Sequence, residues 1–502
     1  MQEGATSIDL GRSNGTNSNS VGFYERFKLE TREVQPRRRQ PHSFIPKVSK
    51  ARLAELLIRE SFEYGFKLRR KEYRRAMLSR PCIYGVFGSR FGGFHPIKEK
   101  CTGCMRCVQE YPGICTVDRN PELFEFPDSY WVPDDPATST LSPVSIVSYE
   151  ATTGKIPVKG MGYKGAFAGS GWDAIWTDMS EIVRPTRDGV YGREYISTLV
   201  DLGRKPRFLE FSSEGIRQVS RTIEIPIPMI FDRLPANLNC ESVMRSIALA
   251  SKRIRTYFIA PIEETKCLAP DERDQLIPLV SQSTMNRDSY DEIIGEAAAV
   301  ELAEFDANVV EEIRRVKPEF PIIVRLPLTR NAEQTAQELA NERIDAIHLF
   351  ADYHGQGWDR ENPPFVKDLI RAVHGALVKE ALRDDVTLLV SGGITLAEHV
   401  PKAIICGADL VALDTTVLVA LQAEFLGECV SAENCEIKPE KFDSSWGEQR
   451  LVNLLASWYD QLVEILSAMG IRDIRRLRGD VGRAMFDDEL EKEAFADIIH
   501  RA

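Results

Sequence analysis

The chain has 502 residues, of which 43% are hydrophobic and 28% charged, and a formal net charge of −11. This composition excludes a collagen-like, wholly disordered or many-span membrane protein. The acidic balance argues against nucleic acid as a general partner. No run approaches the roughly 18 uninterrupted apolar residues of a membrane span. Residues 1–21 lack the apolar core of a signal peptide, so we expect a protein of the reducing cytoplasm.

The N-terminal part of the chain divides by composition into four segments. Residues 1–48 are rich in Ser, Asn, Gly and Arg and predict a flexible arm, because they offer little apolar surface to bury. Residues 49–80 predict a basic amphipathic helix, whose charged face fits either a solvated surface or a docking surface for an acidic partner or a membrane. A small cysteine-rich unit follows at 81–125, and an irregular connecting region at 126–220.

From residue 221 onward, short apolar runs alternate with helical stretches, which indicates a parallel sheet covered on both sides. We count seven runs, and their rhythm fits a (β/α)8 TIM-like barrel at 221–430 better than a doubly wound sheet. A helical C-terminal extension is expected at 431–502. The runs lie at 226–231, 256–261, 276–282, 320–327, 344–351, 386–394 and 408–415, with helices expected at 241–254, 290–304, 332–342, 364–382 and 397–406.

The strongest motif is a group of cysteines, since five of the ten in the chain lie within residues 82–115. In a reducing compartment such a group is typical of a metal site rather than of disulfides. Cys101, Cys104 and Cys107 follow one another at two-residue spacing. This spacing is typical of an iron–sulfur cluster, whereas zinc sites usually use two separated pairs.

The run resembles half of a bacterial ferredoxin motif with one departure. Tyr111 stands where that motif has a further cysteine before a proline, and this cysteine normally ligates a second cluster. We therefore predict a ferredoxin-like unit with a single [4Fe–4S] cluster. Cys115 is the expected fourth ligand, and Cys82 is the alternative.

Two loops near the end of the predicted barrel have the pattern of a phosphate cradle. Glycines let backbone amides approach a phosphate, and helix N-termini favour its negative charge. In (β/α)8 barrels such sites lie after the last two strands, although turn and N-cap chemistry explains either loop alone. The residues concerned are Ser391, Gly392, Gly393, Gly407, Asp414, Thr415 and Thr416.

Two further elements fall at the carboxyl ends of predicted strands, where barrel active sites are built. Arg325 ends the run 320–327 and could stabilise a reduced, anionic flavin, or could pair with a neighbouring carboxylate. His354 lies in a loop with Gly355 and Gly357, which fits either a site or a surface loop.

On these residues the chain resembles the FMN-binding synthase domain of glutamate synthases over roughly residues 220–435. VRLP is similar to the family's VKL, ADYHGQGWD to GHDGGTGAS, SGGI to DGGL, and LVSQSTMN to MAQGAKPG; ICGADLVALDTTVLVAL is the most specific stretch. A ferredoxin-like unit ahead of such a domain resembles the archaeal-type enzymes. The resemblance implies that Gly392, Gly393 and 414–416 hold the FMN phosphate, and that Arg325 and Gln282 line the flavin ring.

The chain also departs from the family. Cys429 and Cys435 keep two of the three cysteines that hold a [3Fe–4S] cluster in the family, and Glu440 stands at the third position. Met285 replaces a lysine of the family, so 2-oxoglutarate is not assumed as substrate. The chain starts Met1-Gln2-Glu3 and offers no amidotransferase nucleophile there.

The expected function is that of an iron–sulfur flavoprotein oxidoreductase subunit. It would pass electrons between a [4Fe–4S] cluster and FMN for amino-acid or imine chemistry on a small-molecule substrate. The alternative is a non-catalytic electron-transfer or scaffolding subunit of a larger complex. No dinucleotide fingerprint stands out, so we expect a hetero-oligomer whose partners are NAD(P)H- or ferredoxin-linked subunits and an amidotransferase subunit.

Overall fold

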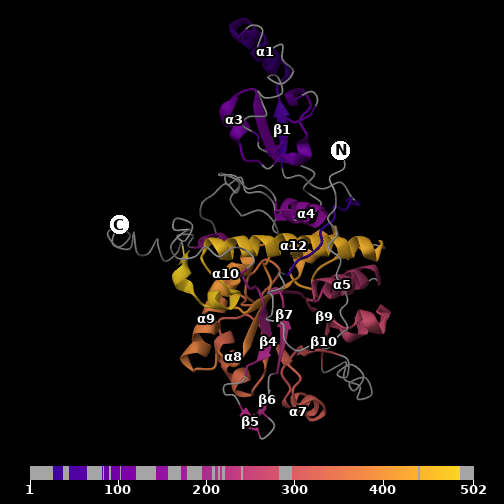
Figure 1. Cartoon of the computed structure of the whole chain (residues 1–502), viewed down its shortest axis with the longest axis vertical. Helices are drawn as coiled ribbons and strands as arrows, with labels where there is room; N and C mark the ends of the chain where they lie inside the picture. Colours follow the sequence, from indigo (N-terminus) through magenta and orange to yellow (C-terminus); the bar gives the residue numbers. More distant parts are fainter. Residues whose placement is uncertain are drawn as a thin grey trace, which may run out of the picture.

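The computed structural model describes residues 27–37, 44–64, 82, 84–89, 92–101, 103–119, 143–156, 171–177, 195–205, 210–212, 215–217, 221–238, 241–281, 297–438 and 441–486. A barrel forms the larger part, and the cysteine-rich unit lies to the side of it, past the helices α4 (Pro143–Thr153) and α12 (Ser444–Ala468), which pack outside the ring of barrel helices (Figure 1). Among the described helices, none has the length and apolar character needed to cross a membrane.

Eight parallel strands close the barrel, which confirms the predicted (β/α)8 architecture. Their runs are nearly all apolar and buried, because helices cover the outside while side chains fill the inside. The strands are β8 (Met229–Phe231), β9 (Phe258–Pro261), β10 (Leu276–Val280), β11 (Val300–Leu302), β12 (Ile322–Pro327), β13 (Ala346–Phe350), β14 (Thr387–Ser391) and β15 (Leu410–Leu413).

The count of seven strands is wrong by one, and the missing strand is β11. The sequence predicted a helix at 290–304, but residues 300–302 pair in parallel with β10 and β12. The strand has three residues and a charged Glu301 at its centre. A run this short and interrupted by a charge gives no apolar signal.

Helices surround the barrel at the predicted places, with two additions. The expected helices at 241–254, 332–342, 364–382 and 397–406 correspond to α5 (Glu241–Ile254), α8 (Ala332–Asn341), α9 (Val366–Lys379) and α10 (His399–Cys406). The additions are α7 (Ala307–Val316) and the short α11 (Thr415–Ala420). Asp306 caps α7 by accepting hydrogen bonds from the Asn308 and Val309 amides.

One end of the barrel is closed by an antiparallel strand pair. β4 (Val200–Arg204) pairs with β7 (Arg221–Ile225), and the Gly203 carbonyl accepts a hydrogen bond of 2.7 Å from the hydroxyl of Thr387. Because Thr387 is the first residue of β14, this pair covers the amino-terminal end of the strands. The mouth of the barrel is therefore the opposite end, where the strands finish.

Three smaller strand pairs lie outside the barrel and the cysteine-rich unit. They are β3 (Ile175–Thr177) with β18 (Ala484–Phe486), β5 (Glu210–Ser212) with β6 (Gly215–Arg217), and β16 (Glu424–Phe425) with β17 (Ile437–Lys438).

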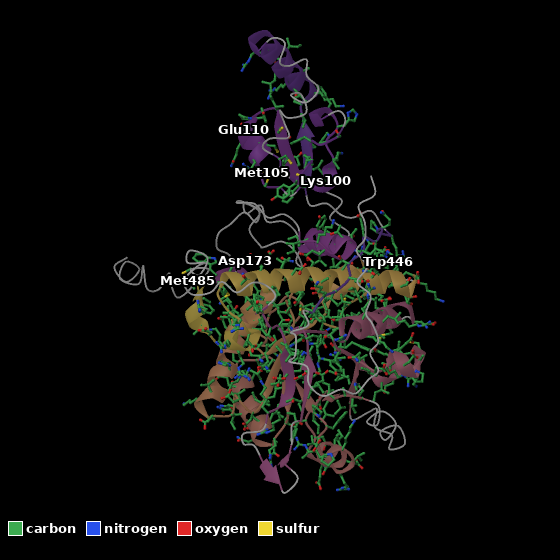
Figure 2. All side chains as sticks on the ribbon, in the orientation of Figure 1. Lys100, Met105, Glu110, Asp173, Trp446 and Met485 are labelled. Atoms are coloured by element: carbon green, nitrogen blue, oxygen red, sulfur yellow. A yellow bond between two sulfur atoms is a disulfide. The ribbon has the colours of Figure 1, made fainter. Side chains whose placement is uncertain are left out.

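Two helices lie between the barrel and the cysteine-rich unit. α12 (Ser444–Ala468) is the helix expected in the C-terminal extension, and α4 (Pro143–Thr153), which the sequence did not predict, packs along it (Figure 1). Figure 2 shows Trp446 toward one end of α12. The indole Nε1 of Trp446 donates to the Gln35 carbonyl, so residues 27–37 of the predicted arm lie along this helix.

The cysteine-rich unit is built on an antiparallel pair of β1 (Phe44–Val48) and β2 (Cys115–Arg119). β1 falls in the segment predicted as a flexible arm; it is ordered because its backbone pairs with β2 over all five residues. The predicted helix at 49–80 corresponds to α1 (Lys50–Tyr64), and 65–80 lie outside the described residues. The remaining elements are η2 (Gly92–Phe94), η3 (Lys98–Lys100) and α3 (Arg106–Glu110).

An apolar cluster joins the cysteine-rich unit to the barrel. Phe44 of β1, Ile146 of α4 and Leu396 of the loop after β14 are buried together, and Cys101 packs against them. Figure 2 places Lys100 and Met105 on the side of the unit that faces α4 and α12. The cysteines therefore lie next to the loop that leaves β14 at the barrel mouth.

Asn453 of α12 connects three segments and provides a test of this packing. Its amide nitrogen donates to the carbonyls of Arg32, Ala151 and Thr152 at 2.8 to 3.2 Å. Asn453→Leu removes this donor from all three carbonyls, of which that of Thr152 keeps a hydrogen bond from the Val34 amide, and we expect a loss of about 1–3 kcal/mol in the free energy of unfolding. Urea unfolding measures it, with Glu464→Gln on the exposed face of α12 as the control. Equal stability of Asn453→Leu and Glu464→Gln would contradict the role of Asn453 in connecting these segments.

Candidate functional site

Four cysteine thiols converge on one cavity in the N-terminal unit. Cys82, Cys101, Cys104 and Cys107 line an empty volume of about 310 Å³, and all four are free thiols. The chain between the first two motif cysteines turns at Gly103, which has a φ of +69° and whose ideal Cβ would lie 2.5 Å from the Phe44 ring. Glycine at this position lets the motif wrap closely around the cavity.

Cys115 lies beside this group and differs from it in two respects. It is 1% exposed, and it is not among the residues that line the cavity. Its thiol shares a hydrogen bond with Cys107, which lowers the pKa of Cys107 to about 7. Burial raises the pKa of Cys101, by contrast, to about 12. The predicted ligands Cys101, Cys104 and Cys107 are thus brought together, with both candidates for the fourth position nearby.

A second cavity, which we call the mouth cavity, lies at the carboxyl ends of the barrel strands. It has an empty volume of about 280 Å³. Its polar lining comes from residues that end or follow strands, together with a loop after β15. Those that matter below are Asp232, Arg233, Arg325, Ser391, Asp414 and Glu433.

Arg325 at the floor of this cavity is held by two carboxylates. Its guanidinium donates to both oxygens of Asp232, at 2.8 and 3.1 Å, and to Glu301 at 3.3 Å. Burial alone would raise the pKa of Asp232, but the Arg325 charge lowers it well below its usual range. The sequence left open a flavin contact or a carboxylate partner for Arg325, and the structure shows the carboxylate partners.

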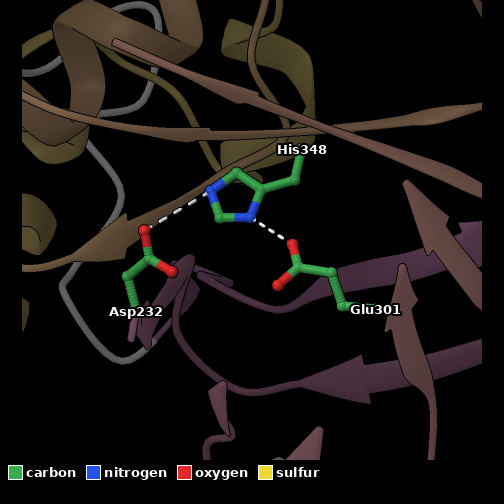
Figure 3. Close-up of side chains that lie close together, drawn as sticks. All are labelled: Asp232, Glu301 and His348. Atoms are coloured by element: carbon green, nitrogen blue, oxygen red, sulfur yellow. Dashed lines mark hydrogen bonds and ion pairs between the residues drawn. The ribbon is translucent and has the colours of Figure 1, made fainter. Parts of the chain in front are cut away.

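His348 of β13 extends this buried network. Its Nδ1 lies 2.5 Å from Glu301 Oε1, and its Nε2 lies 2.9 Å from the Ser391 hydroxyl and 3.8 Å from Asp232 Oδ2. Figure 3 shows the imidazole between the two carboxylates, with one nitrogen facing each. Asp232, Glu301 and His348 are at most 4% exposed. The three come from three different strands or strand ends, and the sequence analysis named none of them.

The glycine loop after β14 presents unpaired backbone amides. Gly392 and Gly393 have φ values of +94° and +70°. The amides of Gly392, Gly393 and Ile394 donate to no group in the part of the chain that the structure describes. Successive amides of this kind are a favourable place for an anion. The neighbouring amides of Thr395 and Leu396 donate instead to His399 Nδ1.

Of the second predicted phosphate loop, only residues 414–416 lie beside the glycine loop. The Thr416 hydroxyl donates to the Ile394 carbonyl at 2.7 Å, so 414–416 and 391–394 are neighbours. The Asp414 carboxylate accepts from the amide and the hydroxyl of Thr415. Burial and the nearby Asp232 raise the pKa of Asp414 to about 7.

Gly407 does not belong to this group. It precedes β15, at the opposite end of that strand from Asp414. Its ideal Cβ would lie 2.4 Å from His374 of α9. The glycine is therefore required by helix packing and not by a ligand at the mouth.

The loop after β13 packs on the glycine loop. The ideal Cβ of Gly355 would lie 2.7 Å from the Phe365 ring, and that of Gly357 would lie 2.8 Å from Leu369. The His354 amide donates to Asp352, while His354 is not among the residues that line the mouth cavity. Gln282 lies outside the described residues.

A loop bearing Cys429 and Cys435 covers the mouth cavity. These two cysteines form a disulfide, and Ser431, Ala432 and Glu433 between them line the cavity. Glu433 forms an ion pair with Arg233, which follows β8. In this form the two thiols are bonded to each other and are not available as ligands.

The comparisons with known proteins agree with this geometry. Residues 300–472 match the family model described as a conserved region in glutamate synthase. The archaeal-type glutamate synthase [NADPH] of Dehalococcoides mccartyi is 23% identical over 445 residues, which cover 76% of this chain and 86% of the relative. The archaeal glutamate synthase [NADPH] of Archaeoglobus fulgidus is 24% identical over 464 residues, covering 78% of this chain and 88% of the relative.

Among solved structures, the recombinant flavin-binding domain of baker's yeast flavocytochrome b2 aligns with a TM-score of 0.42 and 12% identity. It covers 63% of this chain and 76% of that one. Residues 300–472, which match this family model, contribute the strands β11 to β15 of the closed (β/α)8 barrel. Its similarity to archaeal-type glutamate synthases extends over most of its length, and the resemblance that the motifs indicated is confirmed.

The glycine loop gives a matched pair of substitutions. Alanine at Gly392 would adopt a φ of +94° and would place its Cβ 2.5 Å from the Asp352 carbonyl oxygen. We expect Gly392→Ala to lower the free energy of unfolding by about 1–3 kcal/mol. Gly375 in α9 has open space at its Cβ, so Gly375→Ala should stabilise by about 0.5–1 kcal/mol. Urea unfolding measures both variants. A change of the same sign in their free energies of unfolding would contradict the close approach of Gly392 to the Asp352 carbonyl.

Asp414 should make stability depend on pH. Its pKa is about 7 in the folded protein and about 4 in an unfolded chain. Between these values the folded protein binds the additional proton. The free energy of unfolding therefore falls as the pH rises from about 4 to 7, by at most about 1.4 kcal/mol per pH unit.

The Asp414→Asn variant tests this dependence, because it removes the titrating group while keeping an oxygen that can accept from Thr415. Denaturant unfolding at pH 5 and pH 8 should show a gain in stability for the variant, relative to the wild type, only at the higher pH. An identical pH dependence of the two proteins would contradict the burial of this carboxyl.

Proposed function

We propose that the protein is a glutamate-synthase-like oxidoreductase subunit that exchanges electrons between a [4Fe–4S] cluster and FMN. The observation that carries the proposal is the position of the cysteine cavity beside the barrel mouth, with Cys101 packed against the cluster of Phe44 and Leu396. Relatives named glutamate synthase align over three quarters of the chain, which extends well beyond the barrel. This coverage favours an enzyme over a scaffolding subunit.

The donor set of the N-terminal cavity fits an iron–sulfur cluster, because such clusters are held by four thiolates. We assign Cys101, Cys104 and Cys107 as ligands, and Cys82 as the fourth. Cys82 lines the cavity with the other three, whereas Cys115 does not. Cys115 would then act on Cys107 through their hydrogen bond.

The mouth of the barrel fits FMN at two places. The unpaired amides of Gly392, Gly393 and Ile394 would hold its phosphate. Arg325 would lie at the ring end, where its buried Nε has no partner among the described residues. When bound, FMN would supply hydride transfer to a substrate together with single-electron exchange with a cluster.

The remaining residues that line the mouth cavity would contact the substrate. Arg233 and Glu433 form an ion pair across the cavity, and Arg233 is the cation available to a substrate carboxylate if that pair opens. The substrate class supported by the relatives is an amino acid or the imine from which it forms. The partners in this proposal are an NAD(P)H- or ferredoxin-linked subunit and an amidotransferase subunit, in a cytoplasmic hetero-oligomer.

Cofactor content tests the proposal first. Anaerobically purified protein should contain about four irons, matching sulfide and one flavin per chain, with flavin and cluster bands in its visible spectrum. Iron without flavin would favour the alternative of an electron-transfer or scaffolding subunit. Zinc in place of iron would contradict the redox assignment.

Serine substitutions test the ligand assignment. Cys82→Ser should reduce the iron and sulfide content to the level of Cys101→Ser, because each removes a thiolate ligand. Cys115→Ser is the matched control and should keep four irons, with a shifted cluster potential because a weak S–H donor to a ligand sulfur is replaced by a stronger O–H donor. Loss of the cluster in Cys115→Ser and its retention in Cys82→Ser would reverse the assignment. Circular dichroism checks that each variant is folded.

A further inference from the structure

The mouth cavity borders a chain of three hydrogen-bonded side chains that the similarity to glutamate synthases does not explain. Ser391 lines the cavity, and its hydroxyl lies 2.9 Å from His348 Nε2. The other imidazole nitrogen faces Glu301 at 2.5 Å. His348 and Glu301 are 0% exposed and do not line the cavity. Ser391 is therefore the point at which this buried chain reaches whatever occupies the mouth.

Two carboxylates and one guanidinium surround His348. Glu301 of β11 lies on one side of the ring and Asp232, after β8, on the other. Arg325 of β12 bridges the two carboxylates, and Asp414, after β15, is the remaining titratable group that faces Asp232. Each ring nitrogen of His348 thus lies within hydrogen-bond distance of a side-chain oxygen, Nδ1 near Glu301 and Nε2 near Ser391.

The same geometry disfavours a metal ion. Ligand atoms of Asp232, Glu301 and His348 lie within 4.8 Å of one another, which is close enough for one cation. The Arg325 guanidinium, however, already bonds both carboxylates. A divalent cation would have to displace this buried charge.

We propose that Ser391 is the proton donor to the substrate, and that His348, oriented by Glu301, returns a proton to it. This inference rests on the proposed function, in which a carbon–nitrogen double bond is reduced. The reaction would consume one hydride, which FMN would supply to carbon when bound, and one proton, which is supplied to nitrogen. The Ser391 O–H bond breaks as the N–H bond forms, and His348 Nε2–H then returns a proton to the Ser391 oxygen. Oxidation of the amine runs the same transfers in reverse.

The assignment separates three roles. Ser391 is the catalytic residue, because it alone of the three lines the cavity. His348 acts through Ser391. Glu301 orients the ring by accepting a hydrogen bond from Nδ1, as carboxylates beside functional histidines do.

Substitutions in the holoenzyme test the relay. Ser391→Ala should retain iron and flavin, lower kcat about 100-fold or more and leave KM nearly unchanged, because general acid catalysis contributes about 10²–10⁴-fold. Ser391→Thr keeps the hydroxyl and should recover most of this loss. His348→Gln should lower kcat similarly and change the solvent isotope effect on the chemical step, because the proton that Ser391 gives up is then no longer replaced by a histidine. A kcat of Ser391→Ala within twofold of wild type would overturn the proposal.

A second measurement needs no turnover, so it separates a failure of the relay from a failure of the proposed function. In ¹⁵N spectra of histidine-labelled protein, Nδ1 of His348 should carry a proton that exchanges slowly with solvent, and Glu301→Gln should make this exchange fast. An unprotonated Nδ1 would overturn the relay even in an active enzyme. Covalent labelling of Ser391 by a sulfonyl fluoride would also overturn it, since it would identify a nucleophile rather than a proton donor.

Discussion

The buried arginine at the mouth of the barrel is the interaction on which the site depends. A guanidinium inside a barrel is costly unless carboxylates and hydrogen bonds compensate it. Asp232 and Glu301 provide both, and Glu301 also holds His348, which in turn holds Ser391. These groups come from neighbouring positions around the closed sheet, because β12 and β13 pair Arg325 with His348 directly. Loss of one member would leave an unpaired charge in the interior, so the network fixes the floor of the mouth cavity.

The position of the cysteine-rich unit follows from a second constraint, which is apolar packing. Phe44, Ile146 and Leu396 bury one another, and so β1, α4 and the loop after β14 are held together. The same loop carries Gly392 and Gly393, whose close contacts with residues 351–355 exclude any side chain. A cluster held by Cys101 would therefore lie next to the segment proposed to bind phosphate. This arrangement suits a protein that joins single-electron and hydride chemistry.

The sequence predicted the features that follow from local residue patterns. It missed those that depend on which distant residues the fold brings together. The apolar runs were sufficient for the barrel, but the short run around Glu301 hid β11. The spacing of Cys101, Cys104 and Cys107 predicted their convergence, while the proposal of Cys82 over Cys115 rests on the lining of the cavity. Gly407 fitted the loop pattern yet packs on His374. Asp232 and His348 stood in the sequence as single polar residues at the end of or within apolar runs, and only the closed sheet brings them together.

The central claim is that electrons pass between the cysteine-held cluster and the barrel mouth within one chain. It is tested most directly by supplying a one-electron donor anaerobically and following the flavin absorbance in the wild type and in Cys101→Ser reconstituted with flavin. We predict fast bleaching of the flavin in the wild type and a rate at least tenfold slower in the variant, while dithionite bleaches both. Equal rates in the two proteins would show that electrons reach the mouth without the cluster and would contradict the account.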